Sequence, residues 1–372
     1  MHFVQSGQEA LSCLERDSFD VVVSDIRMPG MDGAQLLTEV MRRHPQIVRI
    51  VLSGHSDQDL ALRSVKAAHQ YLSKPCDSET LKSVIIRTCS LRDLLAEDSI
   101  RQLVSKMTSL PSLPSLYHEI LDQLQSRDVS VQKVGEIVSK DLGMTAKILQ
   151  LVNSAFFGLP RHISNPTQAV SLLGLDVVRV LVLSIRILEQ FDPEKMSPLN
   201  LEILWQHSLR TGLLARTIAK MENQKQHSLD ESFTAGLLHD LGKPILSKNF
   251  PEGYQEIEKA TRERKLSSWE AEKELWGATH SEVGAYLLGL WGLPDPIIEA
   301  VAFHHFPSRR EGMGFSPLLA VHIANVLEHQ SNASEGQPLS QVDLQYLSGL
   351  QMTDRLNRWA ETCPETLEPG GT

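Results

Sequence analysis

Short apolar runs alternate with amphipathic helical segments over the first 75 residues, and this alternation limits the fold more than any other feature. Helical patterns and apolar runs follow one another in the order Gly7–Arg16, Asp20–Asp25, Ala34–Arg43, Arg49–Ser53 and Gln70–Pro75. Buried runs separated by helices are typical of a parallel sheet with helices packed on its faces. We therefore predict a doubly wound α/β domain over residues 1–90.

Three polar residues stand at the carboxyl ends of the predicted strands: Asp25, Ser53 and Lys74. Ligands of open parallel sheets bind at this edge, so we expect the three side chains to lie near one another. A carboxylate, a hydroxyl and an ammonium group suit transfer of a phosphoryl group to the aspartate. The ammonium would neutralise the phosphoryl oxygens, and the hydroxyl would donate a hydrogen bond to them.

The motifs around these residues resemble the receiver domain of two-component response regulators. They are Ser24–Gly33 (SDIRMPGMDG), Leu52-Ser53-Gly54 and Lys74-Pro75. The resemblance implies that Asp25 is the phosphoacceptor, Ser53 the switch hydroxyl, Tyr71 the switch aromatic residue and Lys74 the lysine of the site. It also implies a sensor histidine kinase as partner.

One departure from the receiver pattern concerns magnesium. Receivers begin with a strand that ends in an acidic, magnesium-binding pair, whereas Met1–Ser24 reads as one short strand and a helix. We therefore expect the first strand of a flavodoxin-like sheet to be missing, Mg²⁺ not to bind, and Asp25 to be phosphorylated poorly or not at all. Two explanations stay open: a start site placed too far downstream, or a degenerate receiver kept for docking.

Residues 91–108 form a predicted helical linker, which ends at the proline-punctuated boundary Thr108–Pro114. Beyond it the patterns are helical only. Four segments resemble the HDOD domain, an all-helical signalling output module related to HD phosphohydrolases: Leu110–Pro114, Asp141–Leu149, Leu151–Gly158 and Ala169–Gly174. We expect this all-α domain at 109–330, followed by a C-terminal extension at 331–372 that is partly helical and then disordered.

His239 and Asp240 are adjacent at the end of an apolar helical run and offer ligand atoms that suit zinc, iron or manganese. Further histidines stand on predicted helices on either side. Thr279 and Glu282 form a capping box that would fix His280, and a helix from Asp295 would end at His304 and His305. His227 and His329 lie in polar segments, where we expect them to be solvated.

The HD superfamily uses a histidine, the His-Asp pair and a late aspartate, and its HD-GYP branch adds further histidines. By resemblance, the metal ligands would be His207, His239, Asp240, His280, His304, His305 and Asn325, with a divalent Mn, Fe or Zn ion. Asn325 stands where the family has an acid, and Phe306–Arg310 replaces the Gly-Tyr-Pro motif. An amide brings no charge, so metal affinity should fall. The alternative is that these are buried histidines bonded to their neighbours.

The composition bears on which partners and which cellular compartment the protein can have. A formal net charge of -10 argues against a nucleic-acid binder, and the four scattered cysteines favour the reducing cytoplasm. The start of the chain lacks the pattern of a signal peptide. The run Val177–Leu188 contains two arginines and is too short to span a membrane, so we expect no membrane insertion.

Together these patterns favour a response regulator of a bacterial phosphorelay. We expect its HDOD part to act by binding a downstream signalling protein or ligand and not by catalysis, with a homodimer as one possible arrangement. The rival hypothesis is a metal-dependent phosphohydrolase that acts on a nucleotide such as a cyclic dinucleotide. A third is a nucleotide-binding sensor without turnover.

Overall fold

A computed structural model describes residues 2–44, 47–53, 70–74, 79, 81–82, 85, 98–107, 111, 120, 130–153, 163–192, 199–291, 293–310, 314–331 and 341–365. The chain forms two compact units, and each joins two separate segments of the sequence. The first unit contains Met1–Ser115 and Lys243–Pro294, and the second contains Leu116–Gly242 and Asp295–Thr372.

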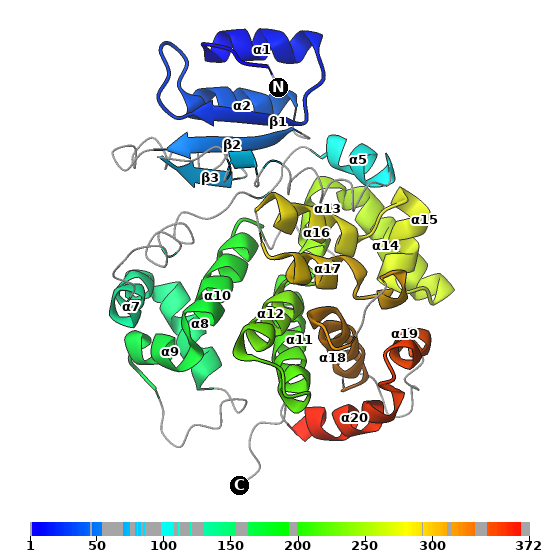
Figure 1. Ribbon diagram of the computed structural model, residues 1–372. Coiled ribbons are helices and arrows are strands. Elements are labelled where there is room, and N and C mark those ends of the chain that lie inside the picture. Colours follow the sequence, from blue (N-terminus) through cyan, green and yellow to red (C-terminus); the bar gives the residue numbers. More distant parts are fainter. Residues whose placement is uncertain are drawn as a thin grey trace. The chain divides into compact units, whose positions relative to one another are not determined.

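In its described residues, the N-terminal part of the first unit is a parallel three-stranded sheet with the helices α1 and α2 (Figure 1). Its elements are α1 (Gly7–Arg16), β1 (Val21–Asp25), α2 (Gly33–Arg43), β2 (Val48–Ser53) and β3 (Gln70–Ser73). The strand order is β1-β2-β3, so β1 forms an edge of the described sheet. The predicted α/β receiver-like fold is confirmed.

Apolar side chains of both helices hold this part together. Leu11 and Leu14 of α1 are buried in one cluster with Leu36 and Val40 of α2. The helix α2 starts at a capping box, in which Asp32 accepts a hydrogen bond from the backbone of Gln35 and the Gln35 side chain accepts one in return. The cap and the apolar face together explain why this segment is helical.

The other described elements of the first unit are helices. Its helices are α5 (Asp98–Ser105), α14 (Pro251–Arg264), α15 (Ser268–Trp276) and α16 (His280–Leu290), while α13 (Gly242–Asn249) begins at the last residue of the second unit's first segment. The predicted capping box at the start of α16 is present, because Thr279 accepts from the Glu282 backbone and the Glu282 carboxylate accepts from the Thr279 backbone at 2.7 Å. It fixes His280 in the first turn of α16.

The second unit is all helical in its described residues. Its elements are α7 (Val131–Ser139), α8 (Leu142–Val152), α9 (Pro166–Leu173), α10 (Leu175–Leu188), α11 (Leu201–Met221), α12 (Gln226–Leu238), α17 (Asp295–Phe303), η3 (Pro307–Arg309), α18 (Pro317–Ser331), α19 (Leu344–Gly349), η4 (Thr353–Arg355) and α20 (Leu356–Glu365). The largely apolar helix α10 is buried along most of its length. None of the helices in the described part combines the length and apolar character needed to span a membrane.

Two glycines let α11 and α12 cross at very short range. A Cβ atom on Gly236 of α12 would lie 2.7 Å from the Cα of Gly212 on α11, and one on Gly212 would lie 2.9 Å from the backbone oxygen of Phe233. Larger residues at this crossing would force the helices apart. The crossing brings His207 of α11 toward His239, which follows α12.

The C-terminal helix α20 packs within the second unit. Trp359 is completely buried, and its Nε1 donates a hydrogen bond to Oε1 of Glu222 at 3.0 Å, at the end of α11. Arg355 forms an ion pair with the same carboxylate. This part of the predicted C-terminal extension therefore contributes to the hydrophobic core.

Candidate metal centre

The polar residues of the receiver-like sheet lie at its carboxyl edge. Lys74 Nζ and Asp25 Oδ1 form an ion pair of 2.6 Å in which both side chains are partly exposed. Ser53 is the last residue of β2 and pairs with Ser73, and Tyr71 pairs with Val51. The Ser53 and Tyr71 side chains lie outside the described part. The strand register thus places the predicted phosphoacceptor and its lysine together at the edge where ligands bind.

Three predicted metal ligands converge in the second unit: His207, His239 and Asp240. The Nε2 atoms of the two histidines are 3.1 Å apart, and each lies 3.5 Å from Oδ2 of Asp240. The side chains of His239 and Asp240 are buried, and that of His207 is 11% exposed. Two nitrogens and one carboxylate oxygen at one point are a donor set that a divalent transition metal accepts.

The opposite ring nitrogens of both histidines contact oxygen acceptors. His239 Nδ1 lies 2.7 Å from the Gly236 carbonyl oxygen, and His207 Nδ1 contacts a carboxylate oxygen of Glu328. A carbonyl oxygen and an ionised carboxylate only accept hydrogen bonds, so a neutral ring that donates to them from Nδ1 would present its Nε2 lone pair to a metal ion. This arrangement of an anchored N–H is typical of metal-binding histidines. The two Nε2 atoms face each other at 3.1 Å, a spacing at which both can bind one metal ion.

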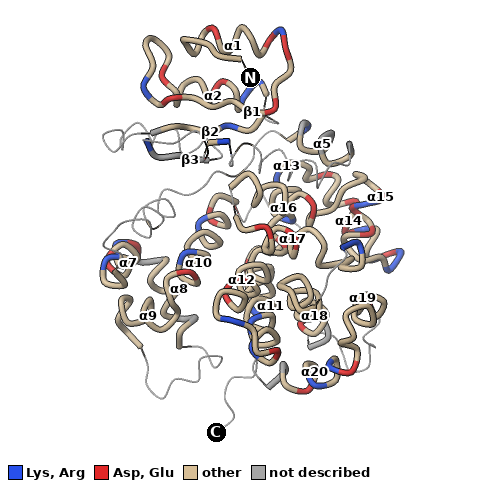
Figure 2. The backbone as a smooth tube through the Cα atoms, viewed as in Figure 1, with Lys and Arg blue, Asp and Glu red and all other residues tan. Residues whose placement is uncertain are grey.

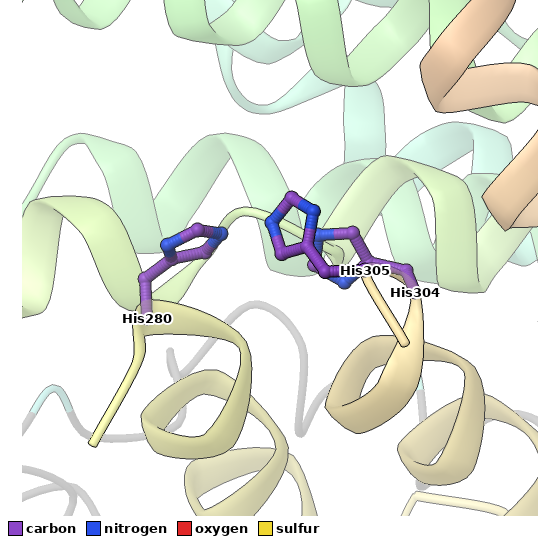
Figure 3. A group of neighbouring side chains, drawn as sticks. All are labelled: His280, His304 and His305. Atoms are coloured by element: carbon purple, nitrogen blue, oxygen red, sulfur yellow. The ribbon is translucent and has the colours of Figure 1, made fainter. Parts of the chain in front are cut away.

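His304 and His280 have the same anchored Nδ1, each within its own unit. His304 follows α17, donates from Nδ1 to the Val301 carbonyl at 2.9 Å, and its ring lies edge-on to His239 with centroids 4.9 Å apart. His280, at the start of α16, donates from Nδ1 to Glu272 at 2.6 Å, and both side chains are fully buried. Figure 3 shows His280 on this first turn and His304 and His305 at the end of α17.

The turn that carries His304 and His305 is held by residues far along the chain. His322 of α18 donates from Nδ1 to the His304 carbonyl at 2.8 Å and accepts from the backbone of Asp343 at 2.9 Å. Burial lowers the pKa of His322, which keeps its ring neutral. The Asp343 carboxylate accepts from the Ser308 backbone at 3.2 Å. His322 and Asp343 therefore position the turn after α17.

Asn325 is 5% exposed, and its Oδ1 has no hydrogen-bond partner among the described residues. It stands on α18 one turn before Glu328, the residue that contacts His207. A buried amide oxygen without a partner is uncommon, and metal coordination is one way to satisfy it. This observation and the donor set of His207, His239 and Asp240 fit a divalent ion.

Two residues near His207 were not predicted from the sequence. Glu328 is 2% exposed and contacts Nδ1 of His207. His329 is exposed, as expected, but its ring lies beside that of His207 with centroids 4.7 Å apart. The helical spacing of three from Asn325 to Glu328 is the signal that could have identified this carboxylate. His227 is also exposed and pairs with Glu231 at 3.1 Å.

Comparison with protein families identifies the family to which the all-helical part of the chain belongs. The family model described as the HDOD domain matches residues 110–307, more than half of the chain. The chain belongs to the HDOD family. The response regulator receiver domain matches residues 1–86, so this HDOD protein also carries a receiver domain, the combination expected of a two-component response regulator.

Curated relatives match the two parts separately. An uncharacterized protein of Treponema pallidum is 30% identical over 206 residues, which are 55% of this chain and 39% of that protein. The DNA-binding transcriptional regulator NtrC of Klebsiella pneumoniae is 41% identical over 87 residues, which are 23% of this chain and 19% of that protein. The HDOD protein thus spans well under half the length of these relatives.

Two solved structures share the HDOD fold. An HDOD domain protein of unknown function from Geobacter sulfurreducens aligns with a TM-score of 0.57 at 23% identity, covering 72% of this chain and 97% of that one. A Shewanella amazonensis protein, provisionally named a phosphohydrolase, aligns with a TM-score of 0.54 at 23% identity, covering 74% of this chain and all of that one. At this identity the likeness is one of fold.

Proposed function

We propose that the HDOD part of this response regulator holds one divalent metal ion and passes on the receiver's signal by contact with a partner, without turnover. The convergence of His207 Nε2, His239 Nε2 and Asp240 Oδ2 carries this proposal, because each histidine is anchored at Nδ1. Asn325 argues against turnover, because the amide brings no negative charge to the site.

The residues divide into ligands and anchors. His207, His239 and Asp240 would hold the ion, and Asn325 would offer its amide oxygen as a fourth donor. A bound divalent ion polarises phosphate oxygens and lowers the pKa of bound water. The Gly236 carbonyl orients His239, and His304 lies edge-on against the same ring. With only one charged ligand, the site suits structural binding better than activation of water.

The receiver part supplies the input. Receiver domains imply a phosphodonor such as a histidine kinase. In our proposal the Asp25 carboxylate attacks the donor's phosphorus atom, the bond from phosphorus to the donor breaks, and Lys74 Nζ neutralises charge on the transferred group. The expected lack of bound magnesium would keep this transfer inefficient. Ser53 and Tyr71 would respond to the added charge by moving toward it. An intact-mass measurement after incubation with a small phosphodonor, compared with Asp25→Asn, tests the acceptor.

A metal-dependent phosphohydrolase acting on a nucleotide, including a cyclic dinucleotide, is the second candidate. The burial of His239 and Asp240 beside His207 favours it, because a water-poor site strengthens the field of a bound ion. If this candidate is correct, purified protein supplied with manganese or iron hydrolyses a nucleotide, and His239→Ala abolishes the hydrolysis.

The decisive experiment measures the metal content of the purified full chain together with hydrolysis of a nucleotide panel. Bound metal without hydrolysis supports the signalling proposal, and hydrolysis at enzymatic rates contradicts it. Asn325→Asp separates the two further. It should raise metal affinity under either proposal but should raise turnover only if the site is catalytic.

A further inference from the structure

We propose that Glu328 is the positioning carboxylate of the metal centre, and that it supplies from behind His207 the negative charge that Asn325 does not bring. This inference rests on the proposed metal site. It assigns a role to a residue outside the set of ligands predicted from the sequence.

The Glu328 carboxylate contacts His207 from a distant position in the chain. Its carboxylate meets Nδ1 of His207, a residue 121 positions away, and the side chain is 2% exposed. It is the one Asp, Glu, Lys or Arg residue in the sequence of α18, which Figure 2 shows as a largely uncharged helix. Burying a single ionised carboxylate on an apolar helix is energetically unfavourable unless a charged or polarised group lies beside it.

The electrostatic surroundings direct the charge of Glu328 toward the site. Arg210 approaches the other carboxylate oxygen at 3.8 Å, but its side chain is 44% exposed, and water screens such a pair. His207 therefore lies between two buried carboxylates, with Glu328 at Nδ1 and Asp240 3.5 Å from Nε2. An imidazole that donates to a carboxylate is a stronger base at its other nitrogen, which favours a cation at Nε2.

A different role for Glu328 follows from its neighbour His329. Ligand atoms of His207, Glu328 and His329 also lie within 4.8 Å of one another, so this trio could hold a separate ion. That ion would need Nδ1 of His207 to lose its proton, and one of its three ligands is an exposed imidazole. The contact between Nδ1 and the carboxylate favours a donated hydrogen bond. We therefore infer that Glu328 positions His207 and does not bind the ion directly.

The test is calorimetric titration of the metal-free full chain with Mn²⁺ and with Zn²⁺. The wild-type chain should bind one ion. Glu328→Gln keeps the shape of the side chain and removes its charge, so affinity should fall about 10- to 100-fold. His329→Ala is the matched control on the same helix end, and its affinity should equal that of the wild type. The double variant Asn325→Asp/Glu328→Gln should recover at least part of the loss, because it returns one charge to the site.

Each other result overturns the proposal. Unchanged affinity in Glu328→Gln refutes the role of Glu328 while leaving the metal site intact. Two ions in the wild type, with one lost in His329→Ala, would make Glu328 a direct ligand. A wild-type chain that binds neither metal refutes the metal site and this inference together. If urea unfolding shows that Glu328→Gln does not fold, Glu328→Asp is titrated instead, and its shorter reach should weaken binding.

Discussion

Nε2 of His207 and Nε2 of His239 lie 3.1 Å apart, although 32 positions separate the two residues in the chain. The helix α11 carries the first, and the second follows α12. The two helices meet at Gly212 and Gly236, where neither position has room for a side chain. The spacing of the candidate metal centre thus depends on two residues that contribute no ligand atom.

Gly236→Ala should destabilise the chain and weaken metal binding. The new Cβ would lie 2.7 Å from Gly212 Cα and 3.0 Å from the Thr211 carbonyl oxygen, so the backbones must separate. Such overpacking costs about 1–3 kcal/mol. Urea unfolding measures the loss. Gly349→Ala is the control, because nothing lies within 4 Å of a Cβ there and α19 should be stabilised or unaffected. Equal effects of the two variants would contradict this account of the crossing.

A metal ion bound at His207, His239 and Asp240 should stabilise the fold against thermal unfolding. A ligand present at about 100 times its dissociation constant stabilises the folded state by about 2.7 kcal/mol. We expect Zn²⁺ or Mn²⁺ to raise the thermal unfolding midpoint of the wild-type chain. His239→Ala should lose this increase whatever its own starting stability, because one of the converging nitrogens is removed. His227→Ala, at a side chain that is 81% exposed, should keep the full increase.

The stability of the fold should depend on pH through His322. Burial holds its pKa below the ordinary value of 6.5, so the unfolded chain binds the proton more readily than the folded one. Its contribution is therefore complete above about pH 6.5 and is lost as the pH falls toward the folded pKa, by up to about 1.4 kcal/mol per pH unit.

His322→Gln tests this dependence, because glutamine can still donate to the His304 carbonyl and accept from the Asp343 backbone but cannot take up a proton in this range. Plots of unfolding free energy against pH should be flatter for the variant between pH 7 and 5. Parallel plots would mean that His322 does not titrate differently in the two states.

Trp359 should be the residue of the C-terminal segment on which stability depends most. It is completely buried and donates to Glu222 at 3.0 Å. Trp359→Ala should cost about 3–5 kcal/mol by guanidinium unfolding. Trp359→Phe keeps most of the packing and leaves Glu222 paired with Arg355, so it should cost much less. A loss below 1 kcal/mol in the alanine variant would show that α20 is not part of the cooperative fold.

Local sequence signals predicted the elements well. The helix Gly7–Arg16 has its predicted bounds, and the capping box of Thr279 and Glu282 forms as its spacing indicates. These features depend on residues within a few positions of one another. The strand ends Asp25 and Ser53 followed from the same short-range patterns.

The contacts that complete the candidate site could not be predicted in this way. Glu328 reaches His207 across 121 positions, and the backbone of Asp343, the N-cap residue of α19, donates to His322 across 21 positions. The domain limits stay a prediction, since Lys243–Pro294 groups with the N-terminal segment in one compact unit. Pairing between distant segments is decided by packing, which periodicity does not encode.

The packing of Trp359 against Glu222 determines where a fragment that contains only the HDOD part can end. A fragment that ends at the family boundary near Pro307, or at the end of α18, would lack Trp359 and Arg355. The buried Glu222 carboxylate would then lose both of these side-chain partners. Such a fragment should precipitate or unfold for reasons unrelated to signalling. Expression boundaries should therefore extend at least to Glu365.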